Sequence, residues 1–429
     1  MELIVTLAIF VICYAIIISE KINRSVIAMI GGLLLIVLKI MPWDLALTKY
    51  IDWNTLFLLI GMMIIVNIAG TSGMFEYFGI KIAKLCKGHP LRIAIGLGLL
   101  TCIASMFLNN VTTILLLAPV TLSITRILKI SPFPFFMFQV FLSNIGGTAT
   151  IVGDPPNTMI SQQVGIPFVD FAIVMVPLVI IITVLCVVIL TIFYRKQSYR
   201  YERKAIYKIM RLDENEFIKD KKLMKISIVV LLVLVLLFIF GDTIGINPAL
   251  LSLFVAFVML MITNGNKESV IEYAYESVDW VSIFFFMGLF MLTGALEEVK
   301  AIDIMANFIM NITHGNLEGT YSMILWVSAV FSGFIDNIPF VSTMIPVLKE
   351  VAPTFNENAN LMWYALAAGA CFGGNLTILG ASANVVAVGI AKKEGVNITY
   401  TKFLVRGFFV TLMSIIVTYI YLYVIFIIL

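Results

Sequence analysis

Four short polar segments interrupt the apolar stretches of this chain, and they hold most of the residues whose types could do chemistry. The segments are Leu108–Thr113, Gly146–Asn157, Ile335–Phe340 and Gly373–Asn384. Inside a bilayer, a break in a helix survives only where protein or a water-filled cavity satisfies its backbone N–H and C=O groups. Free N–H groups at half-helix starts favour an anionic group, whereas unwound carbonyls and Asn or Asp oxygens favour Na⁺ or H⁺. The four segments therefore predict an ion- or substrate-binding site.

Two acids lie within these segments, Asp154 and Asp336. Each lies at a possible helix start, which is a structural interpretation. Asp154 precedes Pro155 in the pattern of a helix N-cap, and Asn337, the residue after Asp336, begins a similar pattern with Pro339. Capping alone does not explain a carboxylate at membrane depth, where such groups are costly and usually functional. We expect both acids to bind Na⁺ or a proton, and Asp154→Asn and Asp336→Asn to abolish coupled transport. Capping alone is the alternative.

The elements that must position these residues are set by composition. Apolar residues make up 61% of the chain and charged residues 12%, with a mean hydropathy of +1.06. A soluble domain carries about 25% charged residues, so the solvent for this chain is lipid. Leu3–Ile18 lacks a basic leader and a cleavage site and is predicted to be the first span. We predict an all-α polytopic membrane protein with the lipid bilayer, and no nucleic acid, as its partner.

The two halves of the chain repeat one another. The matched pairs are Asp52 and Asp279, Asn109 and Asp336, and Asn157 and Asn384. All three are separated by the same 227 positions (279 − 52, 336 − 109 and 384 − 157), which indicates a duplication. At the polar segments the match is imperfect, because neutral Asn109 corresponds to Asp336 and neutral Ala381 to Asp154.

The duplication divides the chain into three parts. We predict a first repeat over 1–193, a basic cytoplasmic linker over 194–225 and a second repeat over 226–429. Each repeat is predicted to hold five spans and one re-entrant hairpin, near 93–128 and 323–348, which gives ten spans. Five is an odd number, so the second repeat is inverted relative to the first.

The positive-inside rule supports this topology. With the linker in the cytoplasm, all but four of the 28 lysines and arginines fall on the cytoplasmic side. Both termini then lie outside, and a bacterial plasma membrane is the expected location. Met74–Lys87 and Val299–Met310 are predicted to be interfacial helices that serve as arms beside the hairpins, or loop filler.

The candidate residues for substrate and ion binding come from the four polar segments. They are Asn109, Asn110, Thr112, Thr113, Gly147, Thr148, Thr150, Gly153, Asp154, Asn157, Asp336, Asn337, Pro339, Gly374, Asn375, Thr377, Gly380, Ser382 and Asn384. Any Na⁺ is expected near Asn110, Asp154, Asp336 and Asn337. No nucleophile–base pair, metal cluster or ATP-binding loop is found among them, so we expect no enzyme and no cofactor other than Na⁺ or H⁺.

The same segments resemble a known group. Phe107–Thr113, Asn144–Asn157, Ile335–Phe340 and Gly373–Asn384 are similar to the ion transporter superfamily. The most similar branch is the citrate-transporter-like one that holds the melanosomal P protein, with arsenical-pump membrane proteins (ArsB) and NhaD-type sodium/proton antiporters as relatives. The resemblance implies a homodimer in which an elevator-like transport domain carries both hairpins against a scaffold. It also implies that Asn109–Thr113, Gly153–Asn157, Asp336–Pro339 and Gly380–Asn384 line the site.

The substrate stays open at this stage. The leading function is a secondary active transporter that moves a small anion with Na⁺ or H⁺, or exchanges Na⁺ for H⁺. The tip Asp336–Pro339 lacks the Ser and Thr that citrate and dicarboxylate carriers of the superfamily place there, which argues against a tricarboxylate site. Arsenite or antimonite efflux, with a separate ATPase subunit, is one alternative. An ion channel with a hairpin filter is the other.

Overall fold

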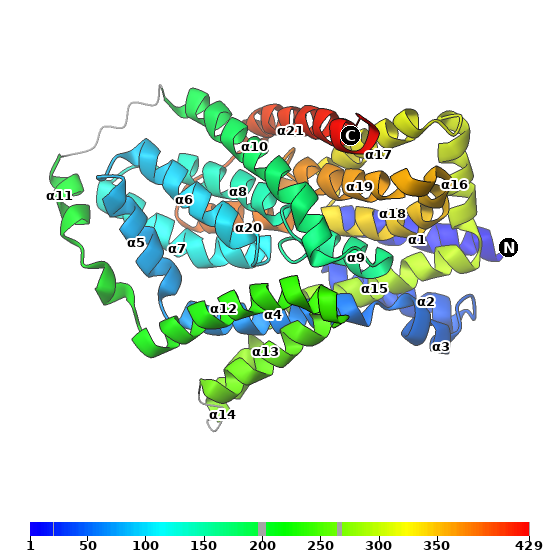
Figure 1. The fold of residues 1–429 in the computed structure, drawn as a ribbon, viewed down its shortest axis with the longest axis horizontal. Coiled ribbons are helices and arrows are strands. Elements are labelled where there is room, and N and C mark those ends of the chain that lie inside the picture. The colour runs from blue at the N-terminus through cyan, green and yellow to red at the C-terminus, as the bar shows by residue number, and fades with distance from the viewer. Residues whose placement is uncertain (20, 196–202, 264–267, 429) are drawn as a thin grey trace.

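A computed structural model describes residues 1–19, 21–195, 203–263 and 268–428 (Figure 1). All regular structure in these ranges is helical, as expected. Seven helices are long and apolar enough to cross a membrane. They are α1 (Glu2–Ser19), α4 (Trp53–Thr71), α7 (Asn110–Leu128), α10 (Phe168–Tyr194), α12 (Lys221–Gly241), α15 (Trp280–Glu298) and α21 (Tyr400–Tyr423).

Several expected spans are shorter than a membrane-crossing helix needs. The helices α2 (Arg24–Val37) and α13 (Pro248–Ile262) have 14 and 15 residues, against about 20 for a full crossing. Conversely, α7 has 19 residues and enough apolar character to count among the long helices, although we predicted it as one arm of a hairpin. The described helices thus comprise seven candidate spans and several shorter apolar helices, among them α2 and α13.

The two long, interrupted stretches each divide into two helices. The first becomes α8 (Phe133–Gly147) and α9 (Pro155–Val164); the second becomes α19 (Ala359–Gly373) and α20 (Ser382–Lys393). Pro155 suits the first position of α9, where its missing N–H would be unpaired anyway. The polar loops between these helices are two of the four segments singled out above.

The other two segments are the turns of helix pairs. A short turn joins α6 (Pro90–Ser105) to α7, and another joins α17 (Leu317–Phe334) to α18 (Asn337–Val351). The Asn109 side chain caps α7 by accepting from the Val111 N–H at 2.9 Å. Asp336 caps α18 by accepting from the Ile338 N–H at 3.2 Å. Both turns therefore leave a helix N-terminus beside a polar side chain.

Equivalent helices of the two halves pack across to the opposite half. The helix α2 packs on α15, and α13 packs on α4. Glycine permits both crossings: a Cβ on Gly288 would lie 2.4 Å from the Ala28 carbonyl carbon, and one on Gly61 2.7 Å from that of Ser252. These backbones touch because neither glycine carries a side chain, so the two halves are interlocked.

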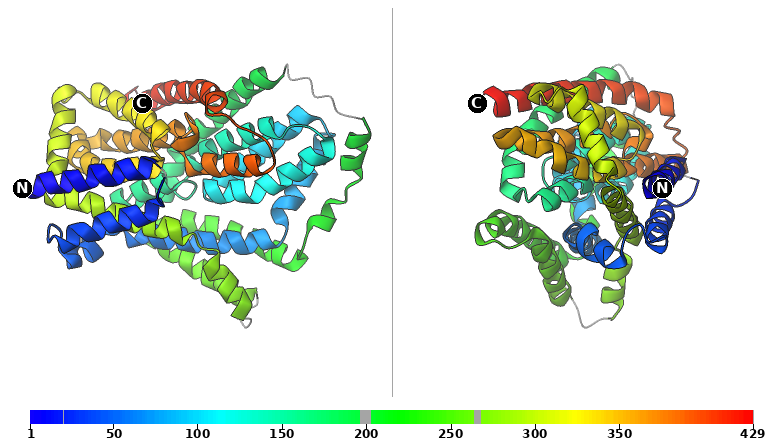
Figure 2. Two further views of the ribbon diagram at one scale, coloured as in Figure 1. Left: turned by 180° about the vertical axis from the view of Figure 1, so that it is seen from behind. Right: turned by 90° about the vertical axis from the view of Figure 1, so that its right-hand side faces the viewer.

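Figures 1 and 2 show how the elements are distributed. The helices α4, α12, α13 and α15 run along one side of the molecule, while α6, α7, α8 and α20 gather toward one end. The helices α17, α18 and α19 lie toward the other end, with α9 between the two groups. The helices α5 (Met74–Leu85) and α16 (Ala301–Ile312) follow α4 and α15 and lead into the helix pairs. Their role as arms stays a prediction, as does the inversion of one half.

The basic linker is only partly described, since residues 196–202 lie outside the described ranges. The helix α11 (Arg203–Arg211) and the short turn after it pack against α5. The Lys219 and Asp220 N–H groups donate to the Ser72 carbonyl at 2.9 and 3.3 Å, and Glu214 forms an ion pair with Lys84. The described part of the linker is thus held against the first half, which differs from a fully solvated connection.

Candidate functional site

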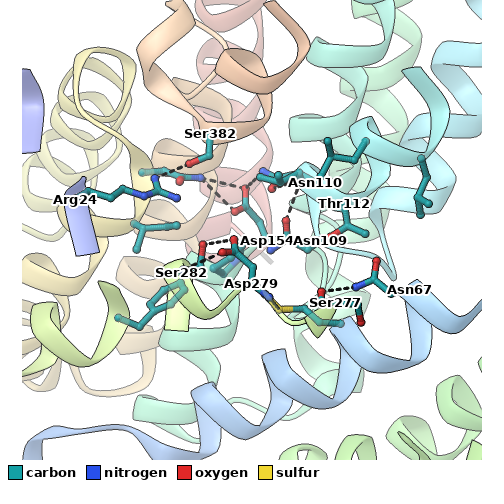
Figure 3. A pocket seen from close by; sticks show the side chains of 18 residues that line it. Arg24, Asn67, Asn109, Asn110, Thr112, Asp154, Ser277, Asp279, Ser282 and Ser382 are labelled. Atoms are coloured by element: carbon teal, nitrogen blue, oxygen red, sulfur yellow. Dashed lines mark hydrogen bonds between the residues drawn. The ribbon is translucent and has the colours of Figure 1, made fainter. Parts of the chain in front are cut away.

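A cavity of about 200 Å³ lies where the polar breaks meet α2, α4 and α15 (Figure 3). The N-terminal ends of α7, α9 and α18 contribute Asn110, Asp154 and Asn337 to its wall. The starts of three helices at one cavity concentrate positive dipole ends there. This arrangement joins segments from both halves of the chain in one place.

Asp154 is almost fully buried, with 1% of its surface exposed. Its carboxylate accepts from the Asn110 amide at 3.3 Å and from the Asn337 amide at 3.1 and 3.3 Å. Among the described residues, no lysine or arginine forms an ion pair with it. A buried carboxylate with only neutral partners is costly, so the geometry favours a bound cation or proton.

Capping does not account for Asp154. Its side chain makes no capping hydrogen bond to α9, although it occupies the N-cap position. The alternative interpretation of this residue as a helix cap alone is therefore wrong. Pro155 and Pro156 leave the first two positions of α9 without N–H donors, and the Asn157 N–H donates to the Asp154 main-chain carbonyl. The side-chain oxygens of Asp154 face the amides of two other elements instead.

Asp336 does act as a helix cap, and it has a full-charge partner. One carboxylate oxygen caps α18, while the other lies 2.8 Å from Nη1 of Arg24. The Ser382 hydroxyl donates to the same oxygen at 2.5 Å. Asp336 lines a second cavity, of about 350 Å³, and Arg24 and Ser382 line both cavities. The two acids therefore line different cavities.

Arg24 lines both cavities, and it was not among the site residues predicted from the sequence. It begins α2 and was counted only among the cytoplasmic basic residues of 19–24. A signal was available, since charged groups within membrane segments usually pair and Asp336 needed a partner. Nothing in the local sequence identifies Arg24 as that partner, because the two residues are 312 positions apart.

Asn144 links the two halves behind the cavity, and it too was absent from the candidates. Its amide nitrogen donates to the side-chain oxygens of Asn375 and Asn384, both at 2.9 Å. Its oxygen accepts from Asn110 at 3.3 Å. Self-comparison of the halves hid this residue, because the equivalent position is Cys371.

The loops of the two broken helices are held by equivalent asparagines. Asn157 donates to the Gly147 and Thr150 carbonyls, each at 3.1 Å. Asn384 donates to the Gly374 and Thr377 carbonyls at 2.7 and 2.9 Å. These amides replace the backbone hydrogen bonds that the unwound loops lack, which satisfies the requirement for such breaks in a membrane.

The predicted residues thus divide into two groups. Seven line a cavity: Asn109, Asn110, Thr112, Asp154, Asn337, Ser382 and, in the second cavity, Asp336. The others shape the loops and helix starts behind it: Thr113, Gly147, Thr148, Thr150, Gly153, Asn157, Pro339, Gly374, Asn375, Thr377, Gly380 and Asn384. For example, the Pro339 carbonyl accepts from the Tyr14 hydroxyl at 2.8 Å, and a Cβ on Gly153 would lie 2.5 Å from the Gly147 oxygen.

The opposite wall of the cavity comes from α4 and α15. Asp279 caps α15 by accepting from the Ser282 N–H at 3.1 Å and its hydroxyl at 2.5 Å. Asn67 donates to the Ser277 carbonyl at 2.9 Å (Figure 3). This wall is polar and includes the exposed carboxylate of Asp279, so Arg24, Asp154 and Asp279 are the charged groups that line the cavity.

Long apolar helices around a polar cavity built from broken helices define a membrane transporter. The solved YdaH transporter of Alcanivorax borkumensis has the same fold, with a TM-score of 0.59 and coverage of 98% of this chain and 97% of that one. The sequences are 10% identical, so this likeness concerns the fold alone.

The sequence defines the family. The family model described as citrate transporter (CitMHS) matches residues 14–369, and the chain belongs to this family. An uncharacterised transporter of Mycobacterium tuberculosis is 40% identical over 425 residues, or 98% of both chains. The human P protein is 30% identical over 92% of this chain but only 56% of its own length. The chain is therefore an integral membrane transporter, and its resemblance to the P protein branch is confirmed.

Proposed function

We propose that this chain is a secondary active transporter in which a cation bound at Asp154 drives the movement of a small anion. The observation that carries the proposal is a carboxylate 1% exposed, at the cavity wall, with amide donors as its partners. Na⁺ or a proton would relieve that buried charge. If Asn110 and Asn337 turn their amides, their oxygens become hard-cation ligands beside the carboxylate.

Anion binding is supported by the rest of the cavity wall. The N-termini of α7 and α18 and the guanidinium of Arg24 face the same space as Asp154. Without a cation, Asp154 would repel an anion there. With Na⁺ or a proton in place, the repulsion from Asp154 is removed, and the helix dipoles and Arg24 attract the anion against the remaining charge of Asp279. This electrostatic dependence of one ligand on the other is a coupling free energy.

The size of the anion is limited by the charge available to bind it. Arg24 is the cationic side chain at this cavity, and its Nη1 already binds Asp336 and Ser382. A tricarboxylate would bring more negative charge than these groups can offset, so we favour an anion of lower charge than citrate. Exchange of Na⁺ for H⁺ at Asp154 is the second candidate, and the occupied state of Nη1 favours it.

We further propose an elevator mechanism in a homodimer. The cavity has one wall from α7, α9 and α18 and the opposite wall from α2, α4 and α15. Movement of the first group against the second would carry the cavity across the membrane, with α5 and α16 as the connecting arms. The ion gradient across the membrane would supply the energy. The proposed mechanism needs no ATPase subunit and no other cofactor.

Purified protein in liposomes tests the proposal. Uptake of radiolabelled citrate, succinate and lactate, and of ²²Na⁺, is measured with sodium and proton gradients imposed separately. We expect saturable uptake that follows one gradient. Asp154→Asn should reduce it to the level of empty liposomes, because an amide carries neither a proton nor the charge that binds Na⁺. Asp303→Asn, which changes an exposed acid on α16, is the matched control. Normal gradient-driven uptake by Asp154→Asn would refute the proposal.

A further inference from the structure

Each half brings one carboxylate together with a polar side chain, although the residues that do so are not the ones matched by the offset of 227 positions. In the first half, the tip residue Asn110 and the loop residue Asp154 lie 3.3 Å apart at their polar atoms. In the second half, the tip residue Asp336 and the loop residue Ser382 lie 2.5 Å apart. Each place thus brings one carboxylate together with a second polar side chain, at a helix N-terminus, from a tip and a loop.

The second place already holds a positive charge. Nη1 of Arg24 lies 2.8 Å from the Asp336 carboxylate and 2.7 Å from the Ser382 hydroxyl oxygen. A nitrogen bearing part of a full positive charge thus stands between the oxygens that would otherwise coordinate a small cation. The guanidinium also lies over the Phe285 ring, 4.8 Å from its centroid, which holds it in place by a cation–π contact.

The first place has no such group. Arg24 also lines the cavity of Asp154, but its hydrogen bonds go to Asp336 and Ser382. Among the described residues, Asp154 has no ion-pair partner. The Asp336 carboxylate is therefore paired with an arginine, whereas the Asp154 carboxylate is not.

We propose that Arg24 is a built-in cation that occupies the second of two cation sites, so that the site at Asp154 alone takes up a free cation. This inference rests on the proposed function, because it assumes cation binding at Asp154. Arginine stays protonated at every physiological pH, so the second site is filled at all times in this conformation. One free cation per chain follows, and removal of Arg24 should uncover a site for a second.

Counting bound sodium tests the inference. The purified full chain is equilibrated with ²²Na⁺ above the pH range in which carboxylates titrate, and the ions bound per chain at saturation are measured. We expect one for the wild type and none for Asp154→Asn. Arg24→Gln, which keeps a hydrogen-bonding side chain but removes the charge, should bind two. Arg24→Lys, which keeps the charge, should bind one.

A double variant assigns the new site and controls for folding. Arg24→Gln with Asp336→Asn removes both charges of the pair and should return the count to one. Sodium should raise the melting temperature of Arg24→Gln more than that of this double variant. A count of one for Arg24→Gln, or of two for the wild type with one lost in Asp336→Asn, would overturn the inference. If the wild type binds none and Arg24→Gln gains one that depends on Asp336, the inference holds and sodium coupling at Asp154 fails.

Discussion

The loop between α8 and α9 and the loop between α19 and α20 have the same backbone plan but different charges. Both are closed by an asparagine that donates to two loop carbonyls. The first then presents Asp154 to neutral amides, whereas the second presents Ser382 to an arginine–aspartate pair. A duplicated scaffold can therefore keep its two breaks for structural reasons while only one of them keeps an uncompensated charge.

The largest expected difference is between substitutions of the two acids, Asp154 and Asp336. Because Asp336 is paired with Arg24, we now expect Asp336→Asn to retain uptake driven by the ion gradient, in contrast to Asp154→Asn. The side chains of Arg24 and Asp336 are 28% and 15% exposed. An ion pair near the surface contributes about 1 kcal/mol. If the lost pair energy appears in the transport barrier, uptake should fall by less than about tenfold. Initial rates in liposomes, with and without the gradient, measure the difference. Complete loss in both variants would return the two acids to equal roles.

A second test compares the equivalent positions Asn144 and Cys371. Asn144→Ala leaves the buried amides of Asn375 and Asn384 each short of a partner, at a cost of about 1–3 kcal/mol per group. Cys371 forms weak thiol hydrogen bonds, one of them to the Asn157 oxygen at 3.4 Å, and it also interacts with Asp154 and Thr148. Cys371→Ala should therefore cost about 1 kcal/mol. Thermal unfolding of the detergent-purified variants should show a clearly larger drop for Asn144→Ala. Equal drops would contradict a special structural role for Asn144.

The smallest expected effect concerns the arms. The helix α5 is tied to the linker by the Lys84–Glu214 pair, whereas the equivalent of Lys84 in α16 is neutral Asn311. The pKa of Glu214 is lowered, chiefly by its hydrogen bond with Lys84. The pair therefore contributes to linker docking above the ordinary Glu value of about 4.3 and is lost as the pH falls through the lowered pKa.

Hydrogen exchange at the linker measures this docking. The N–H groups of Lys219 and Asp220, which donate to the Ser72 carbonyl, should exchange faster in Glu214→Gln at neutral pH. In the wild type, their protection should fall only under acidic conditions, after correction for the intrinsic pH dependence of exchange. Glu216→Gln, at an exposed position in the same turn, is the control. Unchanged protection in Glu214→Gln would show that the backbone contacts alone hold the linker.

The sequence by itself determined the class of structure and the places where it is interrupted. Hydropathy requires lipid-facing helices, and Gly, Pro and Asn residues mark the ends of α8 and α19 and the starts of α9 and α20. These are local signals, because helix formation and termination depend on neighbouring residues. The offset of 227 positions also holds for helix starts, as Trp53 and Trp280 begin α4 and α15.

Only the tertiary structure decided which charges meet. Arg24 reaches Asp336 because α2 crosses closely on α15, and Asn144 reaches Asn384 because α8 and α20 pack together. Such contacts join residues hundreds of positions apart, and no local pattern encodes them. The cost of an unpaired charge was predictable from sequence, but the partner that removes this cost for Asp336 and leaves it for Asp154 depends on how the helices pack.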